Sequence, residues 1–207
     1  MAYYPINLDL AGRKCLVVGG GVVAERKINT LLDFNADVVV VSSDLTPNLR
    51  GLASEMTIEY LPGEYDSTAL EGVFLVIAAT DDREVNKRVS EDSQNRGILV
   101  NVVDDPELCT FFVPATIRRG KLVVSISTSG GAPSLARRIR EQLETHFGSE
   151  YGDLVDLMSE VREEVKAKYA TEAERRRAFI RILDSNIPDL LEQGRLEEAR
   201  GRARQCI

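Results

Sequence analysis

Short apolar runs alternate with amphipathic stretches through the first hundred residues of the chain. The runs at 15–18, 37–41, 73–80 and 98–103 are mostly apolar on both faces, which is typical of buried strands in a parallel sheet. Helical patterns from about Val22 to Phe34 and from Arg83 to Asn95 lie between them, and a weaker strand is predicted at Thr57–Tyr60. This alternation predicts an α/β fold with a Rossmann-type parallel sheet.

The pattern changes after Pro106. A strand is predicted at Lys121–Ser127, followed by a glycine-rich loop and a helix from about Ser134 to Thr145. Beyond a turn at Phe147–Ser149, apolar residues recur only at helical spacing. We therefore expect a Rossmann domain at 1–113, a small α+β segment at 114–149 and a C-terminal helical domain at 150–207.

A glycine-rich turn directly follows the first predicted strand. Gly19, Gly21 and Ala24 occupy the small-residue positions of the G-x-G-x-x-[GA] dinucleotide-binding motif. The first glycine permits the tight turn, the second admits a pyrophosphate, and the small third residue lets the helix pack on the strand. The alternative is an ordinary turn between a strand and a helix. The predicted contacts to a dinucleotide are Gly19, Gly20, Gly21, Val22, Val23 and Ala24.

Further cofactor contacts are predicted at the carboxyl ends of two other strands, where open parallel sheets bind their ligands. Ser42, Ser43 and Asp44 follow the strand at 37–41, and Asp44 lies near the spacing at which an acidic residue binds adenosine ribose. Asp44 is equally explained as a helix cap or turn residue. No arginine directly follows this strand, which favours NAD over NADP. Ala79 and Thr80 end the strand at 73–80.

Composition narrows the class of protein. The chain is 43% apolar and 29% charged, and it has neither a leader-like N-terminus nor an apolar run long enough for a bilayer, so we expect a cytoplasmic protein without membrane contact. A net charge of −7 argues against nucleic-acid binding. Cys15, Cys109 and Cys206 lack zinc-type spacing, and His146 is the single histidine, so no metal site is predicted.

Charge is distributed unevenly along the chain. Residues 110–140 contain no acidic residue, but they contain Arg118, Arg119, Lys121, Arg137, Arg138 and Arg140. This basic segment would suit an anionic partner. The alternative is a solvated surface that acidic neighbours balance in space.

Together these motifs resemble the dehydrogenase/ferrochelatase domains of siroheme synthases. The residues that carry the resemblance are Pro5, Gly12-Arg13, the segments 17–27, 78–82, 101–104, 127–133 and 135–137, Asn86, Phe111 and Pro114. The match covers at least residues 5–145, and the helical tail has the right size.

The resemblance implies a precorrin-2 dehydrogenase, which uses NAD to oxidise precorrin-2 to sirohydrochlorin in siroheme biosynthesis. Some members also insert ferrous iron. The enzymes are homodimers in which the middle segment supplies dimer contacts and the helical segment helps to cover the tetrapyrrole. Because no methyltransferase domain follows in this sequence, we expect a stand-alone form whose substrate is methylated by another protein.

The resemblance also implies roles for individual residues. Asp104 matches the aspartate of the family's Asn-Val-Val-Asp motif and is expected to be the catalytic base, although a strand-end cap is the alternative and Asp105 is a neighbour that could share the role. Arginine binds carboxylates well, and precorrin-2 is rich in them. The expected substrate contacts are Ser127, Thr128, Ser129, Gly130, Arg118 and Arg137.

Two further hypotheses remain open from the sequence. The first is a bifunctional enzyme that is also a sirohydrochlorin ferrochelatase. The second is a non-catalytic NAD-sensing dimer, which would use the same glycine turn but would not need Asp104 or the basic segment.

Overall fold

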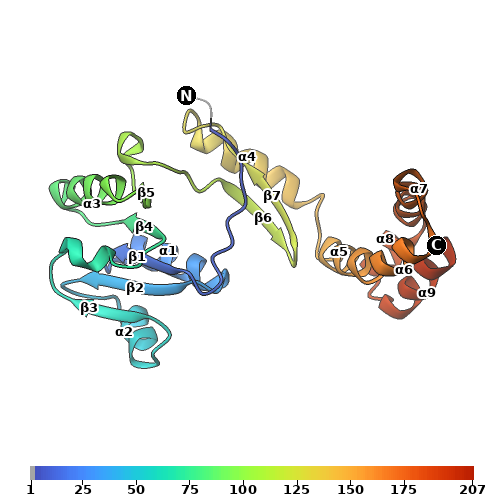
Figure 1. The fold of residues 1–207 in the computed structure, drawn as a ribbon, viewed down its shortest axis with the longest axis horizontal. Helices are drawn as coiled ribbons and strands as arrows, with labels where there is room; N and C mark the ends of the chain where they lie inside the picture. The colour runs from blue at the N-terminus through green and yellow to red at the C-terminus, as the bar shows by residue number, and fades with distance from the viewer. Residues whose placement is uncertain (1–2) are drawn as a thin grey trace. The chain divides into compact units, whose positions relative to one another are not determined.

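A computed structural model describes residues 3–207 of the chain. The chain divides into two compact units, Met1–Val113 and Pro114–Ile207, which are described separately below (Figure 1).

The first unit is built on a five-stranded parallel sheet in the order β3-β2-β1-β4-β5. Its strands are β1 (Lys14–Val18), β2 (Asp37–Ser42), β3 (Glu59–Pro62), β4 (Leu75–Ala78) and β5 (Leu99–Val102). Val18 at the end of β1 pairs with Val41 of β2 and with Ala78 of β4, so these strands end level at one edge. This is the Rossmann-type parallel sheet that the sequence predicts.

Helices cover both faces of this sheet. Alternate strand residues enter different cores, as Val17 and Val40 do on one face and Leu16 and Val39 on the other. Helices α1 (Val22–Asp33) and α2 (Pro47–Ser54) pack on the first face, and α3 (Arg83–Asn95) packs on the second. The short 3₁₀ helices η1 (Ser67–Leu70) and η2 (Pro106–Leu108) complete this unit. The sequence patterns did not predict α2, η1 or η2.

The N-terminal segment packs beside the sheet without joining it. Residues 3–10 form no strand, but Leu8 and Leu10 pack against the core on the α1 face. The ring of Tyr3 meets that of Phe112 edge to face, with 4.9 Å between centroids. The two ends of the first unit are therefore held together.

The second unit begins with an antiparallel hairpin of β6 (Ala115–Arg119) and β7 (Leu122–Ile126). Only β7 was predicted from the sequence. Gly120 forms the turn with a φ of +55°, a conformation that favours glycine. Helix α4 (Pro133–Glu144) packs on this hairpin, which buries Ile117 and Ala136.

The rest of the second unit is helical, as predicted. It contains α5 (Glu150–Glu160), α6 (Arg162–Lys168), α7 (Glu172–Leu183), α8 (Ile187–Glu192) and α9 (Leu196–Cys206), which share one apolar core. The helical pattern from Leu154 to Val165 is interrupted at Val161, between α5 and α6. An ion pair of 2.7 Å joins Lys121 of the hairpin turn to Asp156 of α5. Within residues 3–207, no helix is long and apolar enough to cross a bilayer.

Candidate functional site

A cleft of about 970 Å³ lies at the carboxyl edge of the parallel sheet. The turn between β1 and α1 and the ends of β2 and β4 contribute to its lining. The predicted cofactor residues that line it are Gly19, Gly20, Gly21, Val22, Val23, Ser42, Ser43, Ala79 and Thr80. The structure thus brings these residues, which come from three separate segments, to a single cleft. Ala24 and Asp44 are not part of the lining.

The three glycines of the turn differ in what surrounds them. A Cβ atom on Gly19, where φ is +118°, would lie 2.4 Å from the carbonyl oxygen of Ala79. A Cβ on Gly20 would lie 2.1 Å from the carbonyl oxygen of Asp44. A Cβ on Gly21 would meet nothing within 4 Å. The fold therefore requires glycine at 19 and 20, whereas Gly21 leaves open space in the cleft that a ligand can enter.

The amino end of α1 faces this open space. Gly21 is its N-cap, with extended backbone and no side-chain cap, so the first amides of the helix have no capping side chain. The helix dipole adds a partial positive charge at the same place. Ala24 is fully buried in the core below the turn, where a larger side chain would push the helix off the sheet. This geometry fits a dinucleotide pyrophosphate.

The loop after β2 is tied to the glycine turn. The Ser42 hydroxyl donates to the carbonyl of Asp44 at 2.7 Å, and the amide of Thr46 donates to the carbonyl of Gly20 at 3.0 Å. The carboxylate of Glu25 on α1 accepts hydrogen bonds from the hydroxyl of Thr46 and from the side chain of Asn48. These contacts fix the position of Ser42 in the cleft.

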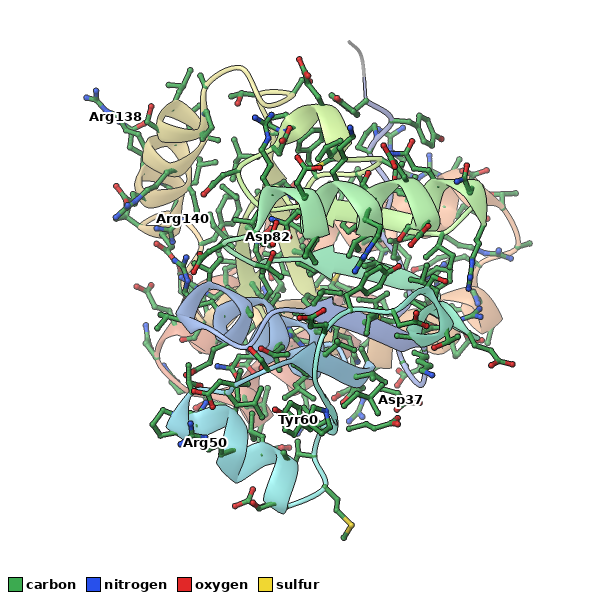
Figure 2. All side chains as sticks on the ribbon, turned by 90° about the vertical axis from the view of Figure 1, so that its left-hand side faces the viewer. Asp37, Arg50, Tyr60, Asp82, Arg138 and Arg140 are labelled. Atoms are coloured by element: carbon green, nitrogen blue, oxygen red, sulfur yellow. The ribbon has the colours of Figure 1, made fainter. Side chains whose placement is uncertain are left out.

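Asp44 is engaged outside the cleft. Its Oδ1 accepts from the amide of Leu45 at 2.9 Å and forms an ion pair of 2.7 Å with Arg50 on α2, which Figure 2 labels. The hydrogen bond from Arg50 holds the pKa of this carboxyl below its ordinary value. The side chain therefore has the turn-residue geometry that was the alternative for this position. Its contact with the ribose stays a prediction.

The cleft also has lining residues that the sequence analysis did not select, namely Gly63, Glu64 and Tyr65 after β3, and Arg88 on α3. The Gly63 amide donates to the carbonyl of Ser42 at 3.0 Å. Arg88 donates to the carbonyl of Tyr65 at 2.7 Å and lies over its ring, 5.5 Å from the centroid. The Pro62-Gly63 turn after a predicted strand was the available signal, because ligands bind where parallel strands end.

Asn86 fixes the loop that follows β4. This side chain is 7% exposed, and its Oδ1 accepts from the hydroxyl of Thr80 at 2.8 Å and from the amide of Thr80 at 3.3 Å. Its Nδ2 donates to the carbonyl of Thr80 at 2.9 Å. Asp82 caps α3 by accepting from the amides of Glu84 and Val85 (Figure 2). Side-chain hydrogen bonds therefore fix both ends of the loop between β4 and α3.

A second hollow, of about 720 Å³, lies at the end of β5. Asp81, Asn86, Asp104 and Asp105 are among its lining residues. Asp104 has a φ of +59°, a left-handed conformation that is uncommon for residues other than glycine. Within residues 3–207, no hydrogen bond or ion pair of its carboxylate is found, so the capping alternative has no supporting contact. Asp105 is 19% exposed and is paired with Arg83 at 3.3 Å.

Lys27 of α1 brings a positive charge near Asp104. Its side chain is half-buried, and burial, together with Arg26, lowers the pKa of the ammonium group, while the charge of Asp104 acts to raise it. The sequence offered only the position of Lys27 on the first predicted helix, which does not reveal this proximity.

The predicted substrate residues lie in the second unit. Within the loop before α4, the amide of Ser129 donates to the Ser127 hydroxyl at 3.1 Å, and the amide of Ala132 donates to the Thr128 hydroxyl at 3.1 Å. Ser129 and Gly130 both have positive φ, at 53° and 79°. The loop therefore has a defined conformation, but two of its hydroxyls already accept internal hydrogen bonds.

Acidic residues one turn later partly balance the basic segment. Arg137 pairs with Glu141 at 2.8 Å, and Arg140 pairs with Glu144 at 2.8 Å. Arg118 lies exposed on β6. Arg138 extends from α4 in Figure 2, and no ion pair of its side chain is found among residues 3–207. The segment keeps cationic character, although less than its sequence indicates.

No metal site is evident in the part of the chain that the structure describes. Residues 3–207 contain no group of three or more His, Cys, Asp or Glu side chains placed to hold an ion. The ring of His146 contacts the carbonyl of Gln142 at 3.0 Å, at the end of α4.

Three protein families match consecutive parts of the chain. The family described as "Putative NAD(P)-binding" matches residues 6–115. "Sirohaem biosynthesis protein central" matches residues 119–146, and "Sirohaem synthase dimerisation region" matches residues 150–207. These matches confirm the resemblance that the motifs indicated. The last description assigns dimerisation to the helical part, whereas the resemblance implied dimer contacts in the middle segment, 114–149.

Individual proteins are similar over nearly the whole chain. The siroheme synthase of Methylobacillus flagellatus is 42% identical over 207 residues, and that of Chromobacterium violaceum is 43% identical over 203 residues. The chain spans 44% and 43% of the length of these two relatives. A solved structure titled "SirC, precorrin-2 dehydrogenase" aligns with a TM-score of 0.76 at 27% identity, covering 97% of this chain and 100% of that one.

Proposed function

From the premise that the chain belongs to the putative NAD(P)-binding family and carries the two sirohaem-synthase regions, we propose that it is an NAD-dependent precorrin-2 dehydrogenase. The observation that carries this proposal is the open space at Gly21, at the start of α1, on the same sheet edge as the carboxylate of Asp104. The similarity to the precorrin-2 dehydrogenase SirC supports the choice of substrate.

Different residues of the chain hold the cofactor, position the loop beside it and accept the proton. Bound NAD supplies the acceptor for the hydride that precorrin-2 loses. The amides at the start of α1 hold the pyrophosphate, and the Asn86–Thr80 contacts fix the loop between the two hollows. Asp104 accepts the proton that leaves with the hydride, so the substrate loses two electrons and sirohydrochlorin is formed. Lys27 adds a positive charge near this carboxylate.

The second unit would bind the carboxylates of the substrate. Arg118 and Arg137, together with the loop from Ser127 to Gly130, are the contacts proposed from the family resemblance. Arg138 is added because its side chain extends from α4 without an ion pair among residues 3–207. The dimerisation region at 150–207 supports a homodimer. A cytoplasmic location also belongs to this proposal, and cell fractionation tests it.

Ferrochelatase activity is the second candidate, with ferrous iron as a substrate. The observation in its favour is again the carboxylate of Asp104 in the hollow at the end of β5, which could accept the pyrrole protons that iron insertion releases. Iron insertion needs no hydride acceptor. Activity without NAD therefore distinguishes it from the dehydrogenase.

The test is an anaerobic assay of the purified protein with precorrin-2 and NAD, followed by ferrous iron. We expect NADH and sirohydrochlorin to appear together. Asp104→Asn should lower kcat by about 10²- to 10⁴-fold, the usual contribution of a general base, with NAD affinity unchanged. Asp105→Asn is the matched control, because this neighbour is already paired with Arg83.

Different results have different meanings. Full turnover by Asp104→Asn would remove the base assignment. NAD binding without any oxidation of precorrin-2 would instead favour the NAD-sensing dimer. A spectral change on adding iron that exceeds the protein-free control would add the chelatase.

A further inference from the structure

One wall of the cleft is made where β2 and β3 end side by side. Ser42 pairs with Pro62 in the parallel register, and the amide of Gly63 donates to the carbonyl of Ser42 at 3.0 Å. Ser42, Ser43, Gly63 and Glu64 all line the cleft. Glu64 thus stands beside the strand end at which Rossmann-type proteins bind the adenosine ribose.

The backbone on both sides of Glu64 is fixed. Gly63 before it has a φ of +128° and its amide is bonded to β2. Tyr65 after it is only 5% exposed, its hydroxyl donates to Asp92 at 3.1 Å, and its carbonyl accepts from Arg88. The side chain of Glu64 itself is exposed at the cleft. A carboxylate is therefore presented from a rigid position.

Asp44, the acidic residue at the expected sequence spacing, is held elsewhere. Its Oδ1 is shared between the amide of Leu45 and the guanidinium of Arg50. Neither Asp44 nor Arg50 lines the cleft. A ribose bound along this wall of the cleft would therefore lie beside Glu64. The carboxylate of Asp44 is instead paired with Arg50.

The charges of the cleft disfavour an additional phosphate. Its acidic lining residues are Glu64, Asp81, Asp82, Glu84 and Glu91, whereas the basic ones are Lys87 and Arg88. Arg88 is engaged with Tyr65, and the Lys87 ammonium lies 3.9 Å from Glu91. A 2′-phosphate at the Glu64 end would face a carboxylate.

We propose that Glu64 binds the adenosine ribose by accepting hydrogen bonds from its hydroxyls. The same carboxylate would repel a 2′-phosphate, so that the cleft selects NAD over NADP. Hydroxyl-to-carboxylate hydrogen bonds are charge-assisted and short, which gives the free 2′-hydroxyl its advantage. This inference rests on the proposed binding of NAD in the cleft. It does not depend on which substrate is oxidised.

The experiment measures dissociation constants for NAD and NADP by isothermal titration calorimetry of the full chain. The variants are Glu64→Gln, Glu64→Lys, Asp44→Asn and Glu59→Lys. Glu59 begins β3, is exposed and lies outside the cleft lining, so its variant has the same charge change at the other end of the strand. We expect Glu64→Gln to weaken NAD binding several-fold. Glu64→Lys should tighten NADP binding at least tenfold, and Glu59→Lys should leave the NAD/NADP ratio within twofold.

Other outcomes overturn the proposal. A tenfold change of the NAD/NADP affinity ratio in Asp44→Asn, with no change in Glu64→Lys, would show that Asp44 binds the ribose. An equal response of Glu59→Lys and Glu64→Lys would show a general effect of net charge. Binding of neither dinucleotide by the unaltered chain would overturn the proposed function as well. If the protein binds NAD but does not oxidise precorrin-2, and the NAD/NADP affinity ratio changes only in the Glu64 variants, the role of Glu64 is still supported although the proposed function is not.

Discussion

Replacing Gly21 with aspartate should change NAD affinity and the stability of the fold in opposite directions. Gly21 has a φ of −81° and a ψ of −176°, an extended conformation that every residue adopts, and its Cβ position is open. Aspartate is among the best N-cap residues, and its charge suits the helix dipole. We therefore expect Gly21→Asp to raise the free energy of unfolding by about 0.5 kcal/mol.

The same change should strongly weaken NAD binding. The new carboxylate would lie where we propose that the pyrophosphate binds, about 4 Å from charges of the same sign. At that distance each pair repels by ~1 kcal/mol in water and ~4 kcal/mol near a protein surface. Even the lower value, applied to about two phosphate charges, gives about 2 kcal/mol. This corresponds to a loss of affinity of about 30-fold, before any steric effect is counted.

Calorimetric titration with NAD and thermal unfolding of the same samples measure both effects. Gly20→Ala is the comparison, because its Cβ would lie 2.1 Å from the carbonyl oxygen of Asp44. This substitution should lower the free energy of unfolding by about 1–3 kcal/mol, as overpacking generally does. The two neighbouring glycines should thus respond with opposite signs in stability.

The reasoning would be refuted if Gly21→Asp bound NAD within threefold of the unaltered chain. The phosphates would then bind elsewhere. A Gly20→Ala protein of unchanged stability would show that the approach of the β2–α2 loop is not as close as the structure indicates.

Two smaller predictions concern buried groups. Asn86→Ala removes the hydrogen bonds to the Thr80 backbone, so it should lower the free energy of unfolding by about 1–3 kcal/mol and raise KM for NAD. Thermal unfolding and steady-state kinetics measure these two effects. An unchanged KM would contradict a role of Asn86 in positioning the loop. Burial in β1 raises the pKa of the Cys15 thiol to about 11. Cys15 should therefore stay protonated and unreactive to a disulfide reagent at about pH 8 until the protein unfolds. Labelling of Cys15 in the folded protein, located by mass spectrometry, would disprove its burial.

The sheet and its principal helices were predictable because their sequence patterns are long and regular. Helix α2 was not, since its eight residues bury only Leu49 and so show no apolar stripe. Strand β6 was missed for a similar reason. Its sequence ATIRR buries only Ile117, and the strand exists because it pairs with β7 across the turn at Gly120. Such tertiary support leaves little trace in a local pattern.

The same limit explains what the sequence could not resolve in the cleft. The spacing to Asp44 is close to that of a ribose-binding acid, but Arg50 lies on the unpredicted helix α2 and pairs with it. The motif identified the glycines, but the separate reason for Gly20 is a carbonyl that belongs to the loop after the next strand. Both facts depend on contacts between segments rather than on spacing.

The positions that the fold leaves unexplained are the most informative about function. Internal contacts account for Gly19, Gly20 and Asn86, each of which would clash or lose hydrogen bonds if changed. Gly21 meets nothing that would exclude a side chain, and Asp104 keeps a left-handed backbone, which costs about 1 kcal/mol or more, without a hydrogen bond among residues 3–207 to offset it. These two residues follow β1 and β5, which β4 separates in the sheet, so the strand ends lie roughly 10 Å apart. A single dinucleotide that crosses this edge would give both residues a role, with its phosphates at the first and its reacting ring near the second.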